Sequence, residues 1–368
     1  MQNKKKVFQK DSLVNFGSSL IAIVFGLLFG LVILLASNPQ DALGGFAMIV
    51  QGGFTDGAAG WGQVLYFATP IIMTGLSVGF AFKTGLFNIG AAGQFVVGAY
   101  TAVHIGVRWH GLGSAHWFVA ILLALLAGAI WGCVPGLLKA YMNVNEVISS
   151  IMMNYIGMYL VNILIKKNVF DQLKNQSLPV QKSCEIPSGG MSALFAGSDA
   201  NIGIFIVLFF VVVTYIILEK TTFGYELKAC GQNRNASKYA GISAQKNIVL
   251  SMAISGALAG IGGALMYLSS AGKYLQVVDV IAPEGFTGIS VALLGLSNPI
   301  GILFAGLFIA YITVGGANMQ LFDFAPEVID IIIAAIIYCG ALSLLFKNFI
   351  KKREMKKLKA LEEKEGEK

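Results

Sequence analysis

The chain has 368 residues, of which 56% are hydrophobic and only 12% are charged. A soluble protein averages about 25% charged residues, so the composition argues against two soluble domains and for one polytopic membrane domain. The net charge of +7 does not predict nucleic-acid binding, because the basic residues lie between and beyond apolar runs, where they record membrane orientation.

A helix crosses the hydrocarbon core of a bilayer with about 20 apolar residues. On this criterion the sequence predicts an all-α membrane bundle of about ten spans. They lie near residues 13–36, 64–82, 86–107, 117–138, 146–165, 201–218, 248–270, 280–297, 299–316 and 327–346. The stretches 86–107 and 280–297 contain polar residues and are either spans or broken, re-entrant helices. The first run is too long for the apolar region of a signal peptide, so we expect it to be retained.

Ten spans place both termini on one side of the membrane. With the N-terminus inside, twenty of the 26 Lys and Arg residues lie on the cytoplasmic side, as the positive-inside rule requires. This predicts a cytoplasmic segment 1–12, a transmembrane domain 13–346 and a basic cytoplasmic tail 347–368 that contacts anionic lipid. Within the domain, 166–200 becomes an external loop and 219–247 a cytoplasmic one.

Forty-four glycines suit a membrane bundle, since glycine lets helices approach closely. Three pairs are spaced four residues apart and predict helix packing: Gly26 and Gly30, Gly75 and Gly79, and Gly256 and Gly260.

The segment Glu219 to Asn247 is polar, although apolar runs flank it on both sides. Asn233 is typical of a helix N-cap, Arg234–Ala240 of a short helix, and Gly241 of the residue that ends one. A short ordered helix on the basic face of a membrane protein suggests a docking site for a soluble partner. The alternative is a solvated loop with no docking role.

Polar side chains at membrane depth are costly and usually face a cavity or another helix. Asn88 and Gln94 offer amide donors and acceptors that suit sugar hydroxyls or the edge of a base. Asn154 and Tyr155 fall near the middle of the fifth span, and Glu284 begins the eighth. The alternative role for the amides is a hydrogen bond between helices.

Several signatures of other functions are missing from the sequence. It has no G-x-x-x-x-G-K-[ST] motif for ATP, no H-E-x-x-H and no G-x-S-x-G. The three histidines and four cysteines show no metal-ligand spacing, so we expect no metal and no cofactor. An enzyme acting on lipid-linked substrates therefore has little support. A channel or an ATPase-independent carrier stays an alternative, with Glu284 as its main ionisable residue, although no internal repeat is evident.

Three segments resemble the permease subunits of ABC importers in the branched-chain amino acid, simple sugar and nucleoside group. They are GLFNIGAAGQ (85–94), NEVISSIMMNYIGMYLVN (145–162) and GYELKACGQNRNASKYAGIS (224–243), with further likeness in GFTGISVALLG (285–295) and GGANMQ (315–320). The likeness covers most of 60–345 and is most similar to nucleoside-uptake permeases, with simple-sugar permeases such as those for ribose as the alternative. The family often has an acidic residue where this chain has Ala92.

The resemblance implies a subunit of a bacterial cytoplasmic membrane importer that works by alternating access and binds no ATP itself. Its partners would be an ABC ATPase, a second permease, which we expect to be a related chain rather than a second copy, and an external substrate-binding lipoprotein. Nucleic acid is not expected. The resemblance implies that the segment coupling to the ATPase includes Gly224, Glu226, Ala229, Gly231, Asn233, Ala240, Gly241 and Ile242. The side chains predicted to line the translocation path are Asn88, Gln94, Asn154 and Glu284.

Overall fold

The computed structural model describes residues 21, 23–322 and 324–341. Its described residues divide into two compact units, one formed by Gly52–Val314 and the other by the described residues on either side, up to Gln51 and from Gly315 onward. The predicted cytoplasmic segment 1–12 and the predicted tail 347–368 fall outside the described residues. So do the start of the first predicted span and the end of the last.

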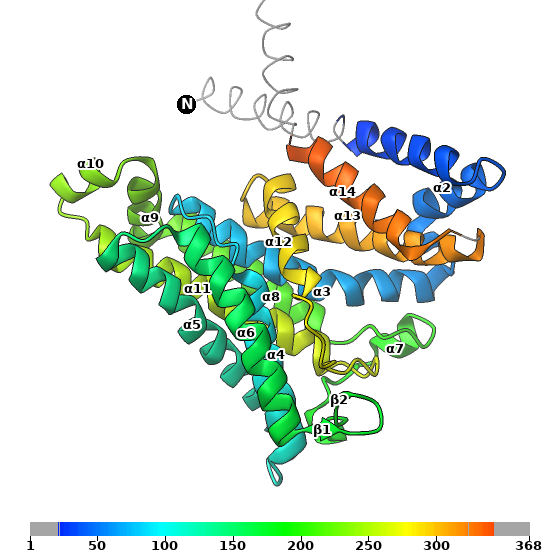
Figure 1. The fold of residues 1–368 in the computed structure, drawn as a ribbon, viewed down its shortest axis with the longest axis horizontal. Helices are drawn as coiled ribbons and strands as arrows, with labels where there is room; N and C mark the ends of the chain where they lie inside the picture. Colours follow the sequence, from blue (N-terminus) through cyan, green and yellow to red (C-terminus); the bar gives the residue numbers. More distant parts are fainter. Residues whose placement is uncertain (1–20, 22, 323, 342–368) are drawn as a thin grey trace, which may run out of the picture. The chain divides into compact units, whose positions relative to one another are not determined.

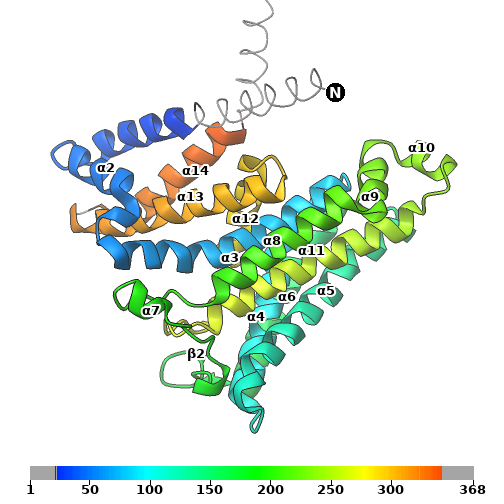
Figure 2. The same ribbon diagram turned by 180° about the vertical axis from the view of Figure 1, so that it is seen from behind.

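The described part of the chain is mostly helical, as predicted (Figures 1 and 2). Six of its helices are long and apolar enough to cross a membrane. They are α3 (Gly57–Lys83), α5 (His116–Met142), α6 (Glu146–Asn168), α8 (Gly203–Lys220), α11 (Ala244–Tyr267) and α13 (Pro299–Asn318). Each contains one of the predicted spans or overlaps most of it. An all-α polytopic membrane protein follows.

The two stretches predicted as spans or broken helices are both interrupted. The stretch 86–107 begins with irregular backbone, and helix α4 (Ala91–Arg108) starts only after it. The stretch 280–297 contains α12 (Pro283–Leu294), which has 12 residues and is therefore only about 18 Å long. That is too short to cross a core of about 30 Å. Leu296 and Ser297 then take positive φ values of 54° and 52° in the turn to α13.

The core of unit Gly52–Val314 is built around α11, which packs against α3, α4 and α5. Gly256 and Gly260 of α11 lie against the backbone of α5 at Ala124 and Gly128, where a Cβ atom would not fit. This close approach is what the four-residue glycine spacing predicted. Gly75 and Gly79 likewise face side chains of Val291 and Ile302.

The predicted external loop 166–200 is an ordered structure. It contains a two-residue antiparallel pair, β1 (Phe170–Asp171) and β2 (Gln176–Ser177), and then η3 (Lys182–Cys184) and α7 (Met191–Leu194). Its Cys184 is fully buried, which raises the pKa of the thiol to about 12. The loop therefore forms a fixed cap over one end of α4 and α6, to which η2 (Gly113–Ala115) adds a turn.

The second unit contains a helix over Ile23–Ser37, α2 (Ala42–Gln51), η4 (Met319–Phe322) and α14 (Pro326–Ala341). Gly26 and Gly30 face Ile336 and Ile332 of α14, so the first glycine pair also packs as predicted. Helix α2 and η1 (Gly52–Phe54) occupy residues that the span prediction left as a loop. Helix α2 forms because the run from Ala42 to Val50 is apolar and buries one face, at Ala42, Gly45 and Ile49.

Candidate functional site

The irregular segment between α3 and α4 contains a buried amide pair. The chain leaves α3 through Gly85, whose φ of +72° favours glycine, and reaches Asn88 before α4 begins. Asn88 Nδ2 donates to Gln94 Oε1 at 2.8 Å, and Gln94 Nε2 donates back to Asn88 Oδ1 at 3.2 Å. The two amides therefore close a ring across the start of α4.

Serines from two other helices complete this network. Asn88 Nδ2 also donates to Ser255 Oγ of α11 at 2.7 Å, and Ser255 Oγ donates to the carbonyl of Ser77 in α3 at 2.7 Å. One helical turn earlier in α11, the hydroxyl oxygens of Ser251 and Thr84 lie 2.7 Å apart and form a hydrogen bond. The sequence analysis did not select these hydroxyls, although Ser251 and Ser255 are spaced four apart on one face of α11.

Asn154 of α6 fastens the same segment from the other side. Its Oδ1 accepts from Gly93 N at 2.8 Å, and its Nδ2 donates to the carbonyl of Ile89 at 3.0 Å. Asn88, Gln94 and Asn154 are each at most 1% exposed. We call Asn88, Gln94, Asn154 and Ser255 the amide brace, because their hydrogen bonds connect α3, α6 and α11 to the break before α4, where Asn154 satisfies two backbone groups.

Glu284 does not join the amide brace. It lies in the first turn of α12, and its neighbour Gly285 packs directly on the backbone of Ala92 at the start of α4. Glu284 instead interacts electrostatically with Lys273. Burial lowers the pKa of Lys273, and the carboxylates of Glu284 and Asp199 oppose that shift.

The segment 219–247 forms two short helices at the end of the bundle where α8 ends and α11 begins (Figures 1 and 2). They are α9 (Thr222–Gln232) and α10 (Arg234–Tyr239). Asn233 caps α10 as predicted, since its Oδ1 accepts from the backbone N–H of Asn235 and of Ala236, both at 3.0 Å. Gly241 follows with φ +79°, which ends the helix.

Four side chains and two glycines attach this segment to the bundle. Glu226 accepts from Asn247 Nδ2 at 3.1 Å, and Lys228 pairs with Glu219 at 2.7 Å. Gly224 packs on the last turn of α8. Gly231 lies so close to the backbone of Lys83, Thr84 and Gly85 that a Cβ atom there would fall 2.8–2.9 Å from it. The segment is therefore fixed from behind to α8, α11 and the break after α3.

The outer face of the segment carries aromatic side chains without cover. Tyr239 is 95% exposed, and Tyr225 is also exposed. Ala240 and Gly241 lie beside Tyr239 and are exposed as well. Exposed aromatic side chains on an ordered polar surface are typical of protein interfaces. The exposure of both tyrosines could not be predicted from the sequence, because it depends on how α9 and α10 pack.

Comparison with known proteins assigns the chain to a family. The family described as branched-chain amino acid transport system / permease component matches residues 60–341. The chain belongs to this permease family. No solved structure matches it.

Three relatives of the permease have names that state a substrate. The guanosine ABC transporter permease protein NupP of Bacillus subtilis is 40% identical over 86% of this chain and 90% of its own. The nucleoside ABC transporter permease protein NupB of Lactococcus lactis is 34% identical over 95% of this chain and 97% of its own. A glucose ABC transporter permease protein of Haloferax volcanii is 32% identical over 91% and 89%. Bacillus subtilis also has a more distant relative, the guanosine ABC transporter permease protein NupQ, and Lactococcus lactis has the nucleoside ABC transporter permease protein NupC.

The three histidines of the permease all form hydrogen bonds, and two of them, His110 and His116, contact the loop 166–200. One ring nitrogen of His116 lies 2.9 Å from Ser183 Oγ and the other 3.1 Å from the carbonyl of Ile105. His110 contacts Gln181, and His104 contacts Tyr100. Over residues 21, 23–322 and 324–341, no three His, Cys, Asp or Glu residues gather in a way that could hold a metal ion.

Proposed function

We propose that this chain is the transmembrane permease subunit of an ATP-driven importer that carries nucleosides across the cytoplasmic membrane of a bacterium. The observation that carries the proposal is the 40% identity to a guanosine permease, which extends over 86% of this chain. A nucleoside permease at 34% identity supports the same substrate class. The glucose permease at 32% supports the second candidate, a simple-sugar importer.

The division of labour follows from the sequence and from the segment 219–247. The sequence has no P-loop, so ATP would bind and react in a partner ATPase. We propose that α10 sits in a groove of that ATPase, with Tyr239 and Ala240 at the contact. The capped, anchored helix would act as the rigid link by which ATP binding moves the spans between inward-facing and outward-facing states.

Our proposal for the translocation path gives the four predicted residues two kinds of role. Asn88, Gln94 and Asn154 are buried and hydrogen-bonded in this conformation, so we propose that they hold the break in the helix that borders the path. Glu284 is partly exposed at the start of the short helix α12, and we propose that it faces the path directly. A weak site suits transport, since substrate must also leave.

We propose the remaining partners on the same grounds. The paired names NupP with NupQ and NupB with NupC support an importer built from two different permease chains. An external lipoprotein would hold the substrate with high affinity and deliver it. We also propose that both termini lie in the cytoplasm, which agrees with the distribution of Lys and Arg along the chain.

The proposal is tested by uptake of radiolabelled guanosine, uridine, ribose and glucose in cells with and without the gene. Loss of nucleoside uptake on deletion supports the substrate class, and loss of sugar uptake alone favours the second candidate. The docking role is tested by Ala240→Arg, with Gln172→Arg in the exposed external hairpin as the matched control. We expect Ala240→Arg to be made and inserted but inactive. Full uptake by this variant would contradict the docking assignment.

A further inference from the structure

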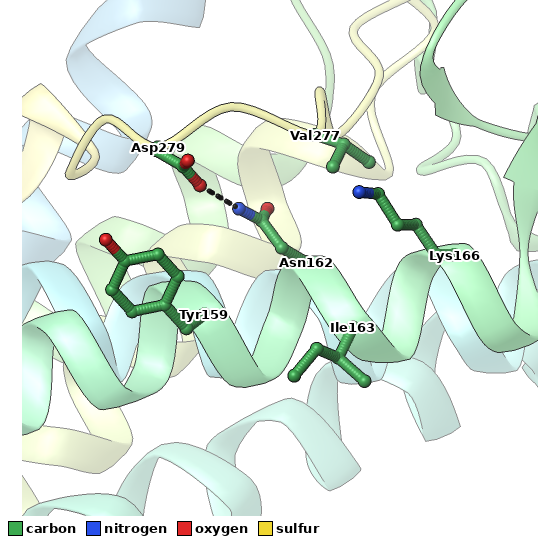
Figure 3. A pocket seen from close by; sticks show the side chains of 6 residues that line it. All are labelled: Tyr159, Asn162, Ile163, Lys166, Val277 and Asp279. Atoms are coloured by element: carbon green, nitrogen blue, oxygen red, sulfur yellow. Dashed lines mark hydrogen bonds between the residues drawn. The ribbon is translucent and has the colours of Figure 1, made fainter.

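A small open cavity lies at the end of α6 that carries Lys166 (Figure 3). It has a volume of about 300 Å³ and is lined by Tyr159, Asn162, Ile163, Lys166, Val277 and Asp279. The first four come from α6, and the last two come from the connection between α11 and α12. The bias of Lys and Arg puts this end of α6 on the external side, where a delivered substrate would enter.

The acidic group of the cavity is held in place by an amide. Asn162 Nδ2 donates to Asp279 Oδ1 at 3.2 Å and to the carbonyl of Val278 at 3.0 Å. These two bonds use both N–H groups of the amide. The second oxygen of Asp279 makes no hydrogen bond to any residue in the described part of the chain and stays available to a ligand (Figure 3).

The connection that carries Asp279 is also fixed at its backbone. Val277 N donates to the carbonyl of Asn175 at 3.2 Å, and Asn175 Nδ2 donates back to the carbonyl of Val277 at 3.3 Å. Nearby, Ser177 N donates to the carbonyl of Leu275 at 2.8 Å. The external hairpin thus holds the connection against the end of α6, so the carboxylate is positioned before a ligand arrives.

An aromatic ring and a cation flank the carboxylate. Tyr159 lies on one side of the Asn162–Asp279 pair and Lys166 on the other (Figure 3). Tyr159 is 51% exposed, and in the described part of the chain neither its hydroxyl nor the Lys166 amine has a hydrogen-bond or ion-pair partner. A tyrosine with a free ring face, a carboxylate with a free oxygen and an ammonium group are therefore available together.

We propose that this cavity is an entry site for ribonucleosides, in which Asp279 accepts hydrogen bonds from the 2′- and 3′-hydroxyls of the ribose and Tyr159 stacks on the base. The inference rests on the proposed function and names the part of the substrate that this chain reads. Carboxylates are suited to ribose hydroxyls because they accept two donors at once. Aromatic rings stack on any base, so the site selects the sugar more than the base. Lys166 adds N–H donors at the rim.

The test uses the complete importer in proteoliposomes, with the external lipoprotein saturating and loaded with either guanosine or 2′-deoxyguanosine. Under this condition the selectivity of the lipoprotein does not set the ratio of the two maximal import rates. We expect the wild-type complex to import guanosine faster. Asp279→Asn keeps the size of the side chain, and we expect it to lower this preference about three- to tenfold, the range that lost hydrogen bonds supply.

Further variants separate the stacking role from the recognition of the sugar. Tyr159→Leu should slow import of both nucleosides about fivefold or more, while Tyr159→Phe should not, because stacking needs the ring and not the hydroxyl. Asp171→Asn and Lys167→Gln are matched controls, since neither residue lines the cavity. Both controls should behave as wild type.

The outcomes distinguish this inference from the proposed function. If the wild-type complex imports ribose or glucose and no nucleoside, the proposed function fails. If it imports guanosine but Asp279→Asn leaves the preference unchanged, the entry site is wrong and the proposed function stands. If free ribose at millimolar concentration competes as well as guanosine in the wild type but not in Tyr159→Leu, the cavity recognises the sugar alone. Tyr159 then contacts the ribose, and its proposed stacking on the base is wrong.

Discussion

The amide brace and the segment of α9 and α10 both consist of polar residues in an apolar chain, but their side chains face opposite ways. Asn88, Gln94 and Asn154 are buried and bonded to partners within the bundle. In α9, Glu226 and Lys228 anchor the rear of the segment, while Tyr225 and Tyr239 are exposed in front. The buried amides therefore act within this chain, where they bond to the break between α3 and α4, whereas the exposed tyrosines leave an aromatic surface without cover in the described part of the chain.

The largest effect is expected from Asn154→Leu, which removes the bonds to Gly93 N and to the carbonyl of Ile89. Two buried backbone groups then lose their partner, at a cost of about 3 kcal/mol in the free energy of unfolding. Thermal unfolding of the purified permease in detergent measures this. Tyr155→Leu on the exposed face of the same helix should leave the midpoint nearly unchanged. Equal midpoints for the two variants would mean that the brace does not stabilise the fold.

Tyr239→Ala should have the opposite profile, with a normal unfolding midpoint and weak binding to the ATPase. An exposed tyrosine at the centre of an interface typically contributes about 2 kcal/mol, which is more than tenfold in affinity. Copurification of the ATPase with the permease, followed by a titration, gives the measurement. The control is Tyr338→Ala, an exposed tyrosine in the other unit. Undiminished ATPase binding by Tyr239→Ala would exclude this face of α10 as the contact.

A smaller effect is expected from Asn233→Ala, because it removes the N-cap of α10 but no buried group. Caps of this kind contribute about 1 kcal/mol, so α10 should fray and its amide protons should exchange faster. Hydrogen exchange followed by mass spectrometry over 224–243 detects the change. Asn235→Ala, at an exposed position two residues later, should exchange like wild type. Unchanged protection in Asn233→Ala would show that packing alone holds the helix.

The smallest effect is expected at Ser150, whose hydroxyl is buried and finds no partner in the described part of the chain. Ser150→Ala removes an unsatisfied group, so it should raise the free energy of unfolding by up to about 1 kcal/mol. Ser149→Ala, which loses bonds to the carbonyls of Asn145 and Glu146, should not. The same thermal measurement applies, and a clear loss of stability in Ser150→Ala would reveal a partner for the hydroxyl.

Local features of the fold could be predicted from the sequence. Asn233 and Gly241 act on residues within three positions of them, so the cap and the end of α10 are encoded where they occur. The glycine pairs are recognised by their spacing alone, although the surfaces that they contact come from distant parts of the chain. The apolar runs fixed the long helices for a similar reason, since each run needs no distant residue to be recognised.

The partners of the polar side chains could not be predicted, because the fold brings them together from far apart. Asn88 meets Ser255 across 167 positions, and Asn162 meets Asp279 across 117. The amides were noticed for their chemistry, but chemistry alone did not decide between a path and a brace. Tyr159 and Asp279 escaped notice because an exposed tyrosine and a loop aspartate are common in any sequence. Their significance comes from one cavity.

Gly231 and Gly85 bring the backbone of α9 into direct contact with the backbone that leaves α3. No side chain separates the backbone of α9 from the backbone that leaves α3, so nothing at this point can compress or change rotamer. A displacement of α9 would therefore move the backbone at Gly85 directly, and Asn88 follows Gly85 by three residues. Any side chain at position 231 would force the two backbones apart. A displacement of α9 would then be transmitted less directly to Asn88, even if both segments kept their own structure.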